Sequence, residues 1–262
     1  MLNISEITIL DKVDQKKYRS FQRTKLARAN RMFKRLIEEN EGRFRIALSI
    51  SGTVIEQMER YRPDVLESFQ ELVASGGVEL LAETYYHSLA FVHSNKEFDR
   101  QVEMHLQKLE DVFSVRPRVF RNTELIYNDA IAAKSETMGF DGVIAEGVEW
   151  NLNGLSPNFL YRAPETARIK TLLRNSTLSD DLSFRFSDPT WSEYPLTPEK
   201  FARWLAEADG DAKRSPGRLA LPVATGATTL VCRHGSRAFG LEMCTSMIGP
   251  ANADSASWRL QA

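Results

Sequence analysis

Side chains able to do acid–base or nucleophilic chemistry follow four segments that are predicted to be strands. Three of these segments are followed by a glutamate and the fourth by an arginine and then an aspartate pair: Glu83 after 78–82, Glu124 after 119–121, Glu146 after 142–145, and Arg174 with Asp180 and Asp181 after 169–173. Ligands of parallel α/β folds bind at the carboxyl ends of the strands. Carboxylates gathered there suit glycoside hydrolysis, in which one acid is an ionised nucleophile and another a protonated acid.

The neighbours of the first two glutamates add to this interpretation. Arg121 and Asn122 precede Glu124, and an arginine at that distance would keep the Glu124 carboxylate ionised, as a nucleophile requires. A helix-initiating glutamate is the structural alternative for Glu124. His87 follows Glu83 by four residues, and it could line a sugar site or be an ordinary hydrogen-bonded histidine.

Other candidate residues also have two interpretations. Tyr85 and Tyr86 could stack on a pyranose ring or pack in the protein, and we expect packing for one of them. Trp191 could be a sugar platform or a core tryptophan. Asp180 and Asp181 could contact sugar, or they could cap and hydrogen-bond a loop.

The elements that must position these residues alternate between strand-like and helix-like patterns from residue 43 onward. The sequence predicts strands at 44–49, 78–82, 119–121, 142–145, 159–161 and 169–173. Helical spacing lies between them, with a capping box at Ser94–Glu97 and a helix beginning near Pro198. This alternation predicts a parallel sheet, either doubly wound or closed as a barrel.

The chain has 262 residues, of which 42% are hydrophobic and 26% are charged, and its net charge is −1. This composition is typical of a globular protein. Bulk charge therefore gives no reason to expect nucleic-acid or membrane binding. No apolar run is long enough for a membrane span, and early charges such as Asp11 and Lys12 argue against a secretory leader, so we expect a cytoplasmic location. Cys232 and Cys244 alone give neither a disulfide framework nor a four-cysteine metal site.

Charge and composition divide the chain into three predicted regions. Residues 1–36 hold ten Lys or Arg against three Asp or Glu, and we interpret them as a basic helical segment with a solvated face. Residues 37–212 form the predicted α/β domain. Residues 213–262 are rich in small residues and are expected to form a divergent, partly disordered tail. The sequence does not fix the oligomeric state.

Three stretches, in this order, resemble glycoside hydrolase family 57, and its α-amylase-like group in particular. They are residues 81–90 (LAETYYHSLA), 120–127 (FRNTELIY) and 178–186 (LSDDLSFRF). The similarity covers about residues 33–206, and both ends diverge. The resemblance implies an incomplete, seven-stranded parallel (β/α) barrel. It also implies retaining chemistry on α-glucans or maltooligosaccharides, with no metal and no organic cofactor.

The resemblance also implies roles for individual residues. The family's nucleophile falls on Glu124, and its second conserved stretch, which lines the sugar site, includes Glu83 and His87. We list the residues expected to bind substrate as Glu83, His87, Arg121, Asp180, Asp181 and Trp191.

Two departures from the family pattern affect the expected activity. The His-Gln-Pro motif that usually opens the family's first strand is missing. The general acid normally lies in an Asp-x-Glu-x-Phe-Gly motif, and nothing after Ala206 has that form. We therefore expect a barrel that is truncated or altered at both ends, with little or no α-glucan hydrolysis.

Two alternatives remain open. The first is a catalytically inactive glucan-binding or remnant protein of the same fold. The second is a metal-dependent polysaccharide deacetylase, which has a related barrel but needs an early Asp pair and a His-x-x-x-His ligand pair. His87 and His93 have a different spacing, and the Asp180–Asp181 pair comes late in the sequence, so the deacetylase is the weaker alternative.

Overall fold

A computed structural model of the chain describes residues 2–3, 15–41, 43–147 and 149–213. Apart from Lys213, the predicted C-terminal tail lies outside these residues, and so does most of the first fifteen residues. None of the helices in the described ranges is long and apolar enough to span a membrane.

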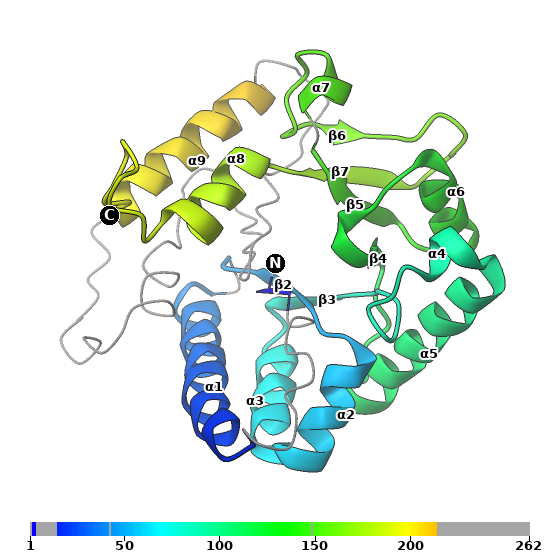
Figure 1. Cartoon of the computed structure of the whole chain (residues 1–262), viewed down its shortest axis with the longest axis vertical. Helices are drawn as coiled ribbons and strands as arrows, with labels where there is room; N and C mark the ends of the chain where they lie inside the picture. The colour runs from blue at the N-terminus through cyan, green and yellow to red at the C-terminus, as the bar shows by residue number, and fades with distance from the viewer. Residues whose placement is uncertain (1, 4–14, 42, 148, 214–262) are drawn as a thin grey trace.

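The strands of the described ranges form two sheets (Figure 1), and a bridge joins the two sheets. In the first sheet, β1 (Leu2–Asn3), β2 (Ile46–Ser49) and β3 (Val78–Leu81) run parallel. The second sheet has the order β4-β5-β7-β6 and contains β4 (Val119–Arg121), β5 (Gly142–Glu146), β6 (Leu160–Tyr161) and β7 (Lys170–Arg174). A parallel bridge between Ala82 and Phe120 joins β3 to β4, so the carboxyl ends of β2, β3, β4, β5 and β7 lie along one edge.

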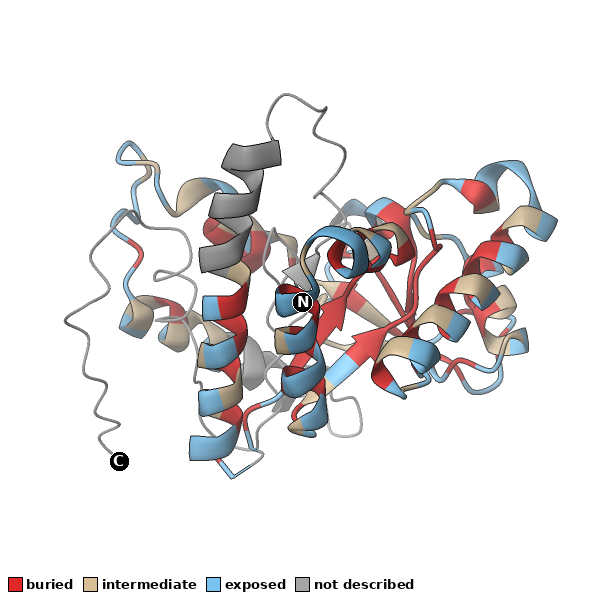
Figure 2. Ribbon diagram, turned by 90° about the horizontal axis from the view of Figure 1, so that it is seen from below, coloured by how far each residue is buried: buried red, intermediate tan, exposed pale blue. Residues whose placement is uncertain are grey.

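Long amphipathic helices cover the outer face of the first sheet. They are α1 (Gln15–Glu39), α2 (Gly52–Tyr61) and α3 (Pro63–Ala74). Their buried side chains pack with those of β2 and β3 in one core, which includes Phe33, Ile37, Ile55, Phe69, Leu72, Leu48 and Leu80. Figure 2 shows this pattern, with buried residues on the sheet side of the helices and exposed residues outside.

A second core lies between the other sheet and two more helices, α5 (Asn95–Phe113) and α6 (Asp129–Thr137). Phe98 and Phe140 each have their ring 5.5 Å from that of Phe120, which is the centre of this core. The short helices α4 (Ala90–His93) and α7 (Glu149–Leu152) follow β3 and β5.

Alternate strand residues point to opposite faces, and both faces of the sheet are buried. Leu48, Leu80 and Val143 belong to the two outer cores, whereas their neighbours Ala47, Leu81 and Ile144 pack together on the other face, with Leu125. Burial on both faces is typical of a parallel sheet with helical crossovers.

The last described segment forms a separate apolar cluster. It contains α8 (Ser176–Asp180), a π-helical turn η2 (Asp181–Arg185) and α9 (Pro198–Lys213). Leu178, Leu182, Leu196 and Phe201 are its buried members, and Trp191 and Trp204 pack against them with ring centroids 6.0 Å apart.

All six predicted strands are present, with small shifts in their bounds. One expectation is wrong: β6 runs antiparallel to β7, so the sheet is not parallel throughout. At Ser94, the side chain caps α5 by accepting from the Glu97 N–H at 3.2 Å. The second bond of a capping box, from the Ser94 N–H to the Glu97 carboxylate, is replaced by other contacts. The Ser94 N–H donates to the Ala90 carbonyl, and the Glu97 carboxylate accepts from Arg100 and Gln101.

The basic N-terminal segment continues into the rest of the fold. Its helix α1 passes the predicted boundary at residue 36 and ends at Glu39. Within its described part, Arg28, Arg31 and Arg35 are exposed, as expected for a solvated face. On the opposite side, Ala29 and Phe33 are buried in the first core.

Candidate active site

Glu83 lies directly after β3, and its side chain is fully buried. The Ser49 hydroxyl, at the end of the neighbouring strand β2, donates to Glu83 Oε1 at 2.8 Å. The other carboxylate oxygen, Oε2, lies 2.7 Å from His87 Nδ1. A buried carboxylate requires partners of this kind, because an unpaired buried charge is very costly.

His105, on α5, fixes the backbone on which Glu83 sits. The Glu83 N–H donates to His105 Nδ1 at 3.1 Å, so this nitrogen carries no proton. His105 Nε2 therefore carries the proton and donates to the Ile50 carbonyl at 2.8 Å. Burial lowers the pKa of His105, which agrees with a neutral ring. The side chain thus ties the ends of β2 and β3 together in one tautomer.

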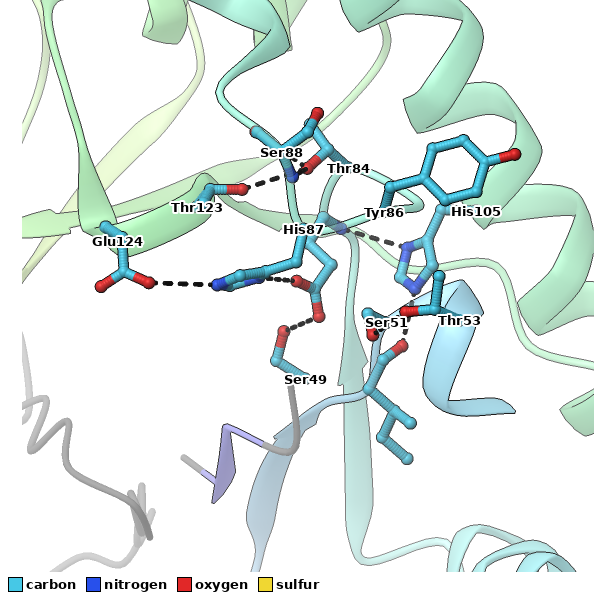
Figure 3. Close-up of polar contacts among 12 residues, drawn as sticks. Ser49, Ser51, Thr53, Thr84, Tyr86, His87, Ser88, His105, Thr123 and Glu124 are labelled. Atoms are coloured by element: carbon cyan, nitrogen blue, oxygen red, sulfur yellow. Dashed lines mark hydrogen bonds and ion pairs between the residues drawn. The ribbon is translucent and has the colours of Figure 1, made fainter. Parts of the chain in front are cut away.

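His87 contacts both Glu83 and Glu124, and Figure 3 shows His87 beside Glu124. Its Nδ1 faces buried Glu83, and its Nε2 lies 3.3 Å from Glu124 Oε1. Glu124 comes from the turn after β4, and its side chain is 68% exposed, whereas that of Glu83 is 0% exposed. The two carboxylates that the sequence places 41 residues apart are therefore linked through one imidazole ring.

The charges within this group shift two pKa values. Burial raises the pKa of Glu83, but the hydrogen bond from His87 and the proximity of His105 and Arg121 together outweigh burial, so the net pKa of Glu83 is lowered. Burial lowers the pKa of His87, but the hydrogen bond to Glu83 and its negative charge outweigh burial, so the net pKa of His87 is raised. Glu83 is therefore ionised at neutral pH and is unsuited to act as a general acid.

Hydroxyl groups hold the turn that carries His87. The Ser88 N–H donates to Thr84 Oγ1 at 2.8 Å, and the Thr84 hydroxyl lies 3.1 Å from the Thr123 hydroxyl of the next turn. From α5, buried Gln101 accepts from the Ser88 hydroxyl at 2.8 Å. These bonds connect the turn after β3 directly to the turn that carries Glu124 (Figure 3).

The backbone is left-handed at both ends of the His87–Glu124 contact. His87 has φ +52°, Glu124 has φ +52° and ψ +21°, and Leu125 has φ +56°. Non-glycine residues in this region are uncommon and are held there by their surroundings. Here buried Leu125 anchors the turn η1 (Thr123–Leu125), and the Asn122 amide donates to the Ile126 carbonyl at 3.0 Å. We call Ser49, Glu83, His87 and Glu124 the β3–β4 site.

A second group of charges lies at and beyond the carboxyl ends of β5 and β7. Arg174, the last residue of β7, donates to Glu146 at 2.9 Å and to Asp180. Asp181 pairs with Arg185 at 2.6 Å. We call these five residues the β7 cluster. Neither aspartate lies on a loop: Asp180 ends α8, Asp181 begins η2, and Asp181 is only 4% exposed.

Burial raises the pKa of Asp181, although Arg185 acts in the opposite direction. Glu146 and Asp180 accept from the same guanidinium, that of Arg174. The two groups at this edge thus differ: a titratable histidine pairs the carboxylates of the β3–β4 site, and arginines pair those of the β7 cluster.

The remaining candidates take mostly structural positions. Tyr85 is buried and its hydroxyl donates to Glu56 at 2.5 Å, whereas Tyr86 is 46% exposed, so one of the two packs as expected. Trp191 packs against Trp204 in the α8–α9 cluster. Among the described residues, no group of three or more His, Cys, Asp or Glu side chains is placed to bind a metal ion.

Sequence reasoning missed two residues that build the site. Ser49 ends a predicted strand, and its side chain reaches a glutamate that the sequence places 34 positions later. His105 could have been noticed, because it lies at helical spacing among Val102, Leu106 and Leu109, all of which are buried. A histidine on an apolar helix face must find hydrogen-bond partners inside the protein.

The sequence matches the profile of glycosyl hydrolase family 57 over residues 2–226, and the chain belongs to this family. A Methanocaldococcus jannaschii protein named "Putative alpha-amylase" is 44% identical over 183 residues. This match covers 70% of the chain but only 38% of the relative's length.

Two solved structures share the fold at low sequence identity. The 4-alpha-glucanotransferase of Thermococcus litoralis has a TM-score of 0.55 at 17% identity, over 72% of this chain and 28% of the other. A "putative polysaccharide deacetylase" of Mycobacterium smegmatis has a TM-score of 0.51 at 16% identity, over 74% and 63%. With family 57 membership, these likenesses support the barrel-like α/β architecture expected from the sequence.

Proposed function

We propose that this chain carries the nucleophile half of a retaining glycoside hydrolase that acts on α-glucans, and that Glu124 is the nucleophile. The observation that carries the proposal is the position of Glu124: it lies at the carboxyl end of a parallel strand, exposed, and in contact with His87. A nucleophilic carboxylate must be reachable by the anomeric carbon and fixed in orientation. Glu83, His87 and Arg121 would form the floor of the sugar site.

A retaining mechanism also needs a second carboxyl group, which acts as the general acid. A retaining enzyme places its acid about 5–5.5 Å from the nucleophile, and the acid must be protonated when the glycosidic bond breaks. Arg174 occupies an oxygen of Glu146 and an oxygen of Asp180. Asp181 has a raised pKa through burial, but Arg185 occupies one of its oxygens. We therefore propose that hydrolysis of unactivated α-glucans by this chain is impaired.

The sequence supplies the reason for a second candidate, a catalytically inactive glucan-binding protein of the same fold. No Asp-x-Glu-x-Phe-Gly segment follows Ala206. Losing a general acid costs on the order of 10²–10⁴-fold in rate.

Asp180, Asp181 and Trp191 remain proposed sugar contacts. The division into 1–36, 37–212 and 213–262 remains a proposal, as does truncation of the barrel at both ends.

A substrate with a good leaving group distinguishes the two candidates. With α-maltosyl fluoride, a Glu124 oxygen would bond to the anomeric carbon while the C–F bond breaks and fluoride leaves with its electron pair, so no acid is needed. Added azide would then attack the same carbon, free Glu124 and give α-maltosyl azide. We expect fluoride release and α-azide from the full chain, a loss of about 10⁴-fold or more in Glu124→Gln, and very slow turnover of maltoheptaose.

The matched control is Glu79→Gln, which removes one negative charge from an exposed position of β3. This variant should release fluoride at the rate of the unchanged chain. Equal rates in Glu124→Gln and the unchanged chain would remove Glu124 as nucleophile. Binding of maltoheptaose without any fluoride release would favour the inactive glucan-binding protein.

A further inference from the structure

We infer that His87 is the positioning residue of the nucleophile, and that it acts as a doubly protonated cation that links buried Glu83 to exposed Glu124. This inference rests on the proposed function, because it assigns His87 a task in the chemistry of Glu124. It goes beyond a place for His87 in the floor of the sugar site, because both ring nitrogens face carboxylates.

The count of protons at the ring carries the argument. A neutral imidazole has one N–H and one acceptor nitrogen, whereas the imidazolium ion has two N–H donors. Ionised Glu83 can only accept, so Nδ1 must donate to it. If Nε2 had no proton, its lone pair would face Glu124 Oε1 at 3.3 Å, and Glu124 would have to be protonated to make a hydrogen bond. A protonated Glu124 could not be a nucleophile.

The charges around His87 favour the cation. Glu83 and Glu124 contribute negative charge from the ends of β3 and β4, and Arg121 contributes the opposing positive charge from β4. From α5, His105 contacts the Glu83 backbone as a neutral ring. Glu83 is fully buried and within 2.7 Å of the ring, so its effect is the least screened by solvent.

The same contact restrains an otherwise exposed side chain. Glu124 is 68% exposed, and such a side chain can occupy several rotamers. The left-handed backbone at His87 and Glu124 brings the two side chains into contact. This backbone conformation is strained for residues other than glycine, and the surrounding structure holds it in place. Restraining the attacking oxygen is the kind of positioning that raises the rate of a displacement at the anomeric carbon.

The first test measures protonation directly and needs no activity. The full chain, labelled with ¹⁵N-histidine, has four histidines, and single His→Gln variants assign their ring signals. At pH 7 we expect both His87 nitrogens to be protonated, and we expect its titration above the ordinary value of about 6.5 and at lower pH in Glu124→Gln. At pH 7 and above, His105 should show one N–H, which reports that the fold is intact. His93 is exposed and serves as the matched control.

The second test follows fluoride release from α-maltosyl fluoride against pH. In the unchanged chain we expect the rate to fall about tenfold per pH unit above the His87 titration point measured by NMR. His87→Gln should be about 10²-fold slower at neutral pH and lose this alkaline limb, while His93→Gln keeps both rate and profile.

The two tests separate the inference from the proposed function. A singly protonated His87 at pH 7, or a titration unchanged by Glu124→Gln, overturns the inference whatever the activity. An unchanged alkaline limb in His87→Gln overturns it too. If the unchanged chain releases no fluoride, the proposed function fails, and the NMR result alone decides whether His87 links the two carboxylates.

Discussion

The β3–β4 site and the β7 cluster each contain a buried carboxylate, and the pKa values of the two are shifted in opposite directions. Burial raises the pKa of both, but in Glu83 the His87 hydrogen bond and the proximity of His105 and Arg121 reverse the effect. In Asp181 burial prevails over the single partner Arg185. Glu83 also accepts from Ser49, so both of its oxygens are engaged. Burial alone therefore does not decide the charge of a carboxylate at this edge, because hydrogen bonds and neighbouring charges can reverse its effect.

The partner type differs as well. Arginine holds its proton at every accessible pH, so the β7 cluster can fix a geometry but cannot exchange a proton at Arg174 or Arg185. Histidine titrates near neutral pH, so the β3–β4 site can change its charge under physiological conditions. The difference separates a group suited to chemistry from one suited to holding β5, β7 and α8 together.

The largest expected effect is on stability after neutralising each buried carboxylate. Glu83→Gln should lower the free energy of unfolding by about 3 kcal/mol at pH 7, because it leaves His87 and buried donors without their ionised partner. Asp181→Asn should cost about 1 kcal/mol or less, since the folded state already disfavours its charge. Urea unfolding of both variants beside the unchanged chain measures the difference. Equal losses would contradict the contrast between the two regions.

A smaller effect is expected from removing the arginine that joins the strands. Arg174→Met keeps much of the buried stem but leaves Glu146 and Asp180 without their shared donor. These carboxylates are about one-third exposed, so we expect a loss of about 1 kcal/mol, which decreases further as salt is added. The exposed pair of Lys34 with Glu71 provides a comparison, and Lys34→Met should have little effect. A salt-independent loss of several kcal/mol would show that Arg174 acts as a buried ion.

The smallest effect is the pH dependence of stability, and its sign differs between the two carboxylates. The folded pKa of Glu83 is lowered, so its contribution is present above its ordinary value of about 4.3 and is lost as pH falls through the folded value. The folded pKa of Asp181 is raised, so the contribution of Asp181 to stability is fully present below its ordinary pKa of about 3.9. That contribution is lost as pH rises through the folded pKa. As pH falls below 5, the difference in free energy of unfolding between the unchanged chain and Glu83→Gln should shrink. Over the same range, the unchanged chain should gain stability relative to Asp181→Asn. Parallel trends would rule out opposite shifts.

The sequence predicted the strands well because their signals are local. Residues 78–82, 119–121 and 142–145 are short apolar runs between helices, and each forms a parallel strand or bridge. It did not predict the direction of β6, since a two-residue strand takes its direction from its partner β7. Asp181 was placed on a loop because a short helical turn of five residues carries almost no periodic signal.

The members of the site could be predicted more readily than their connections. The rule that chemistry gathers at strand ends selected Glu83 and Glu124, which the structure brings to one histidine. The same rule also selected Glu146 and Asp180, which belong to the β7 cluster. Which carboxylate pairs with which cation depends on side-chain reach across neighbouring strands, and spacing along the chain does not encode it.

The left-handed backbone at Glu124 has a consequence for the evolution and engineering of this protein. Glycine adopts this conformation without the steric cost that a side chain incurs, a difference of about 1 kcal/mol. Replacing Glu124 by glycine would therefore relieve strain while removing the proposed nucleophile. Selection for thermal stability alone would favour glycine at this position. A glutamate in a strained turn is what selection for function would maintain.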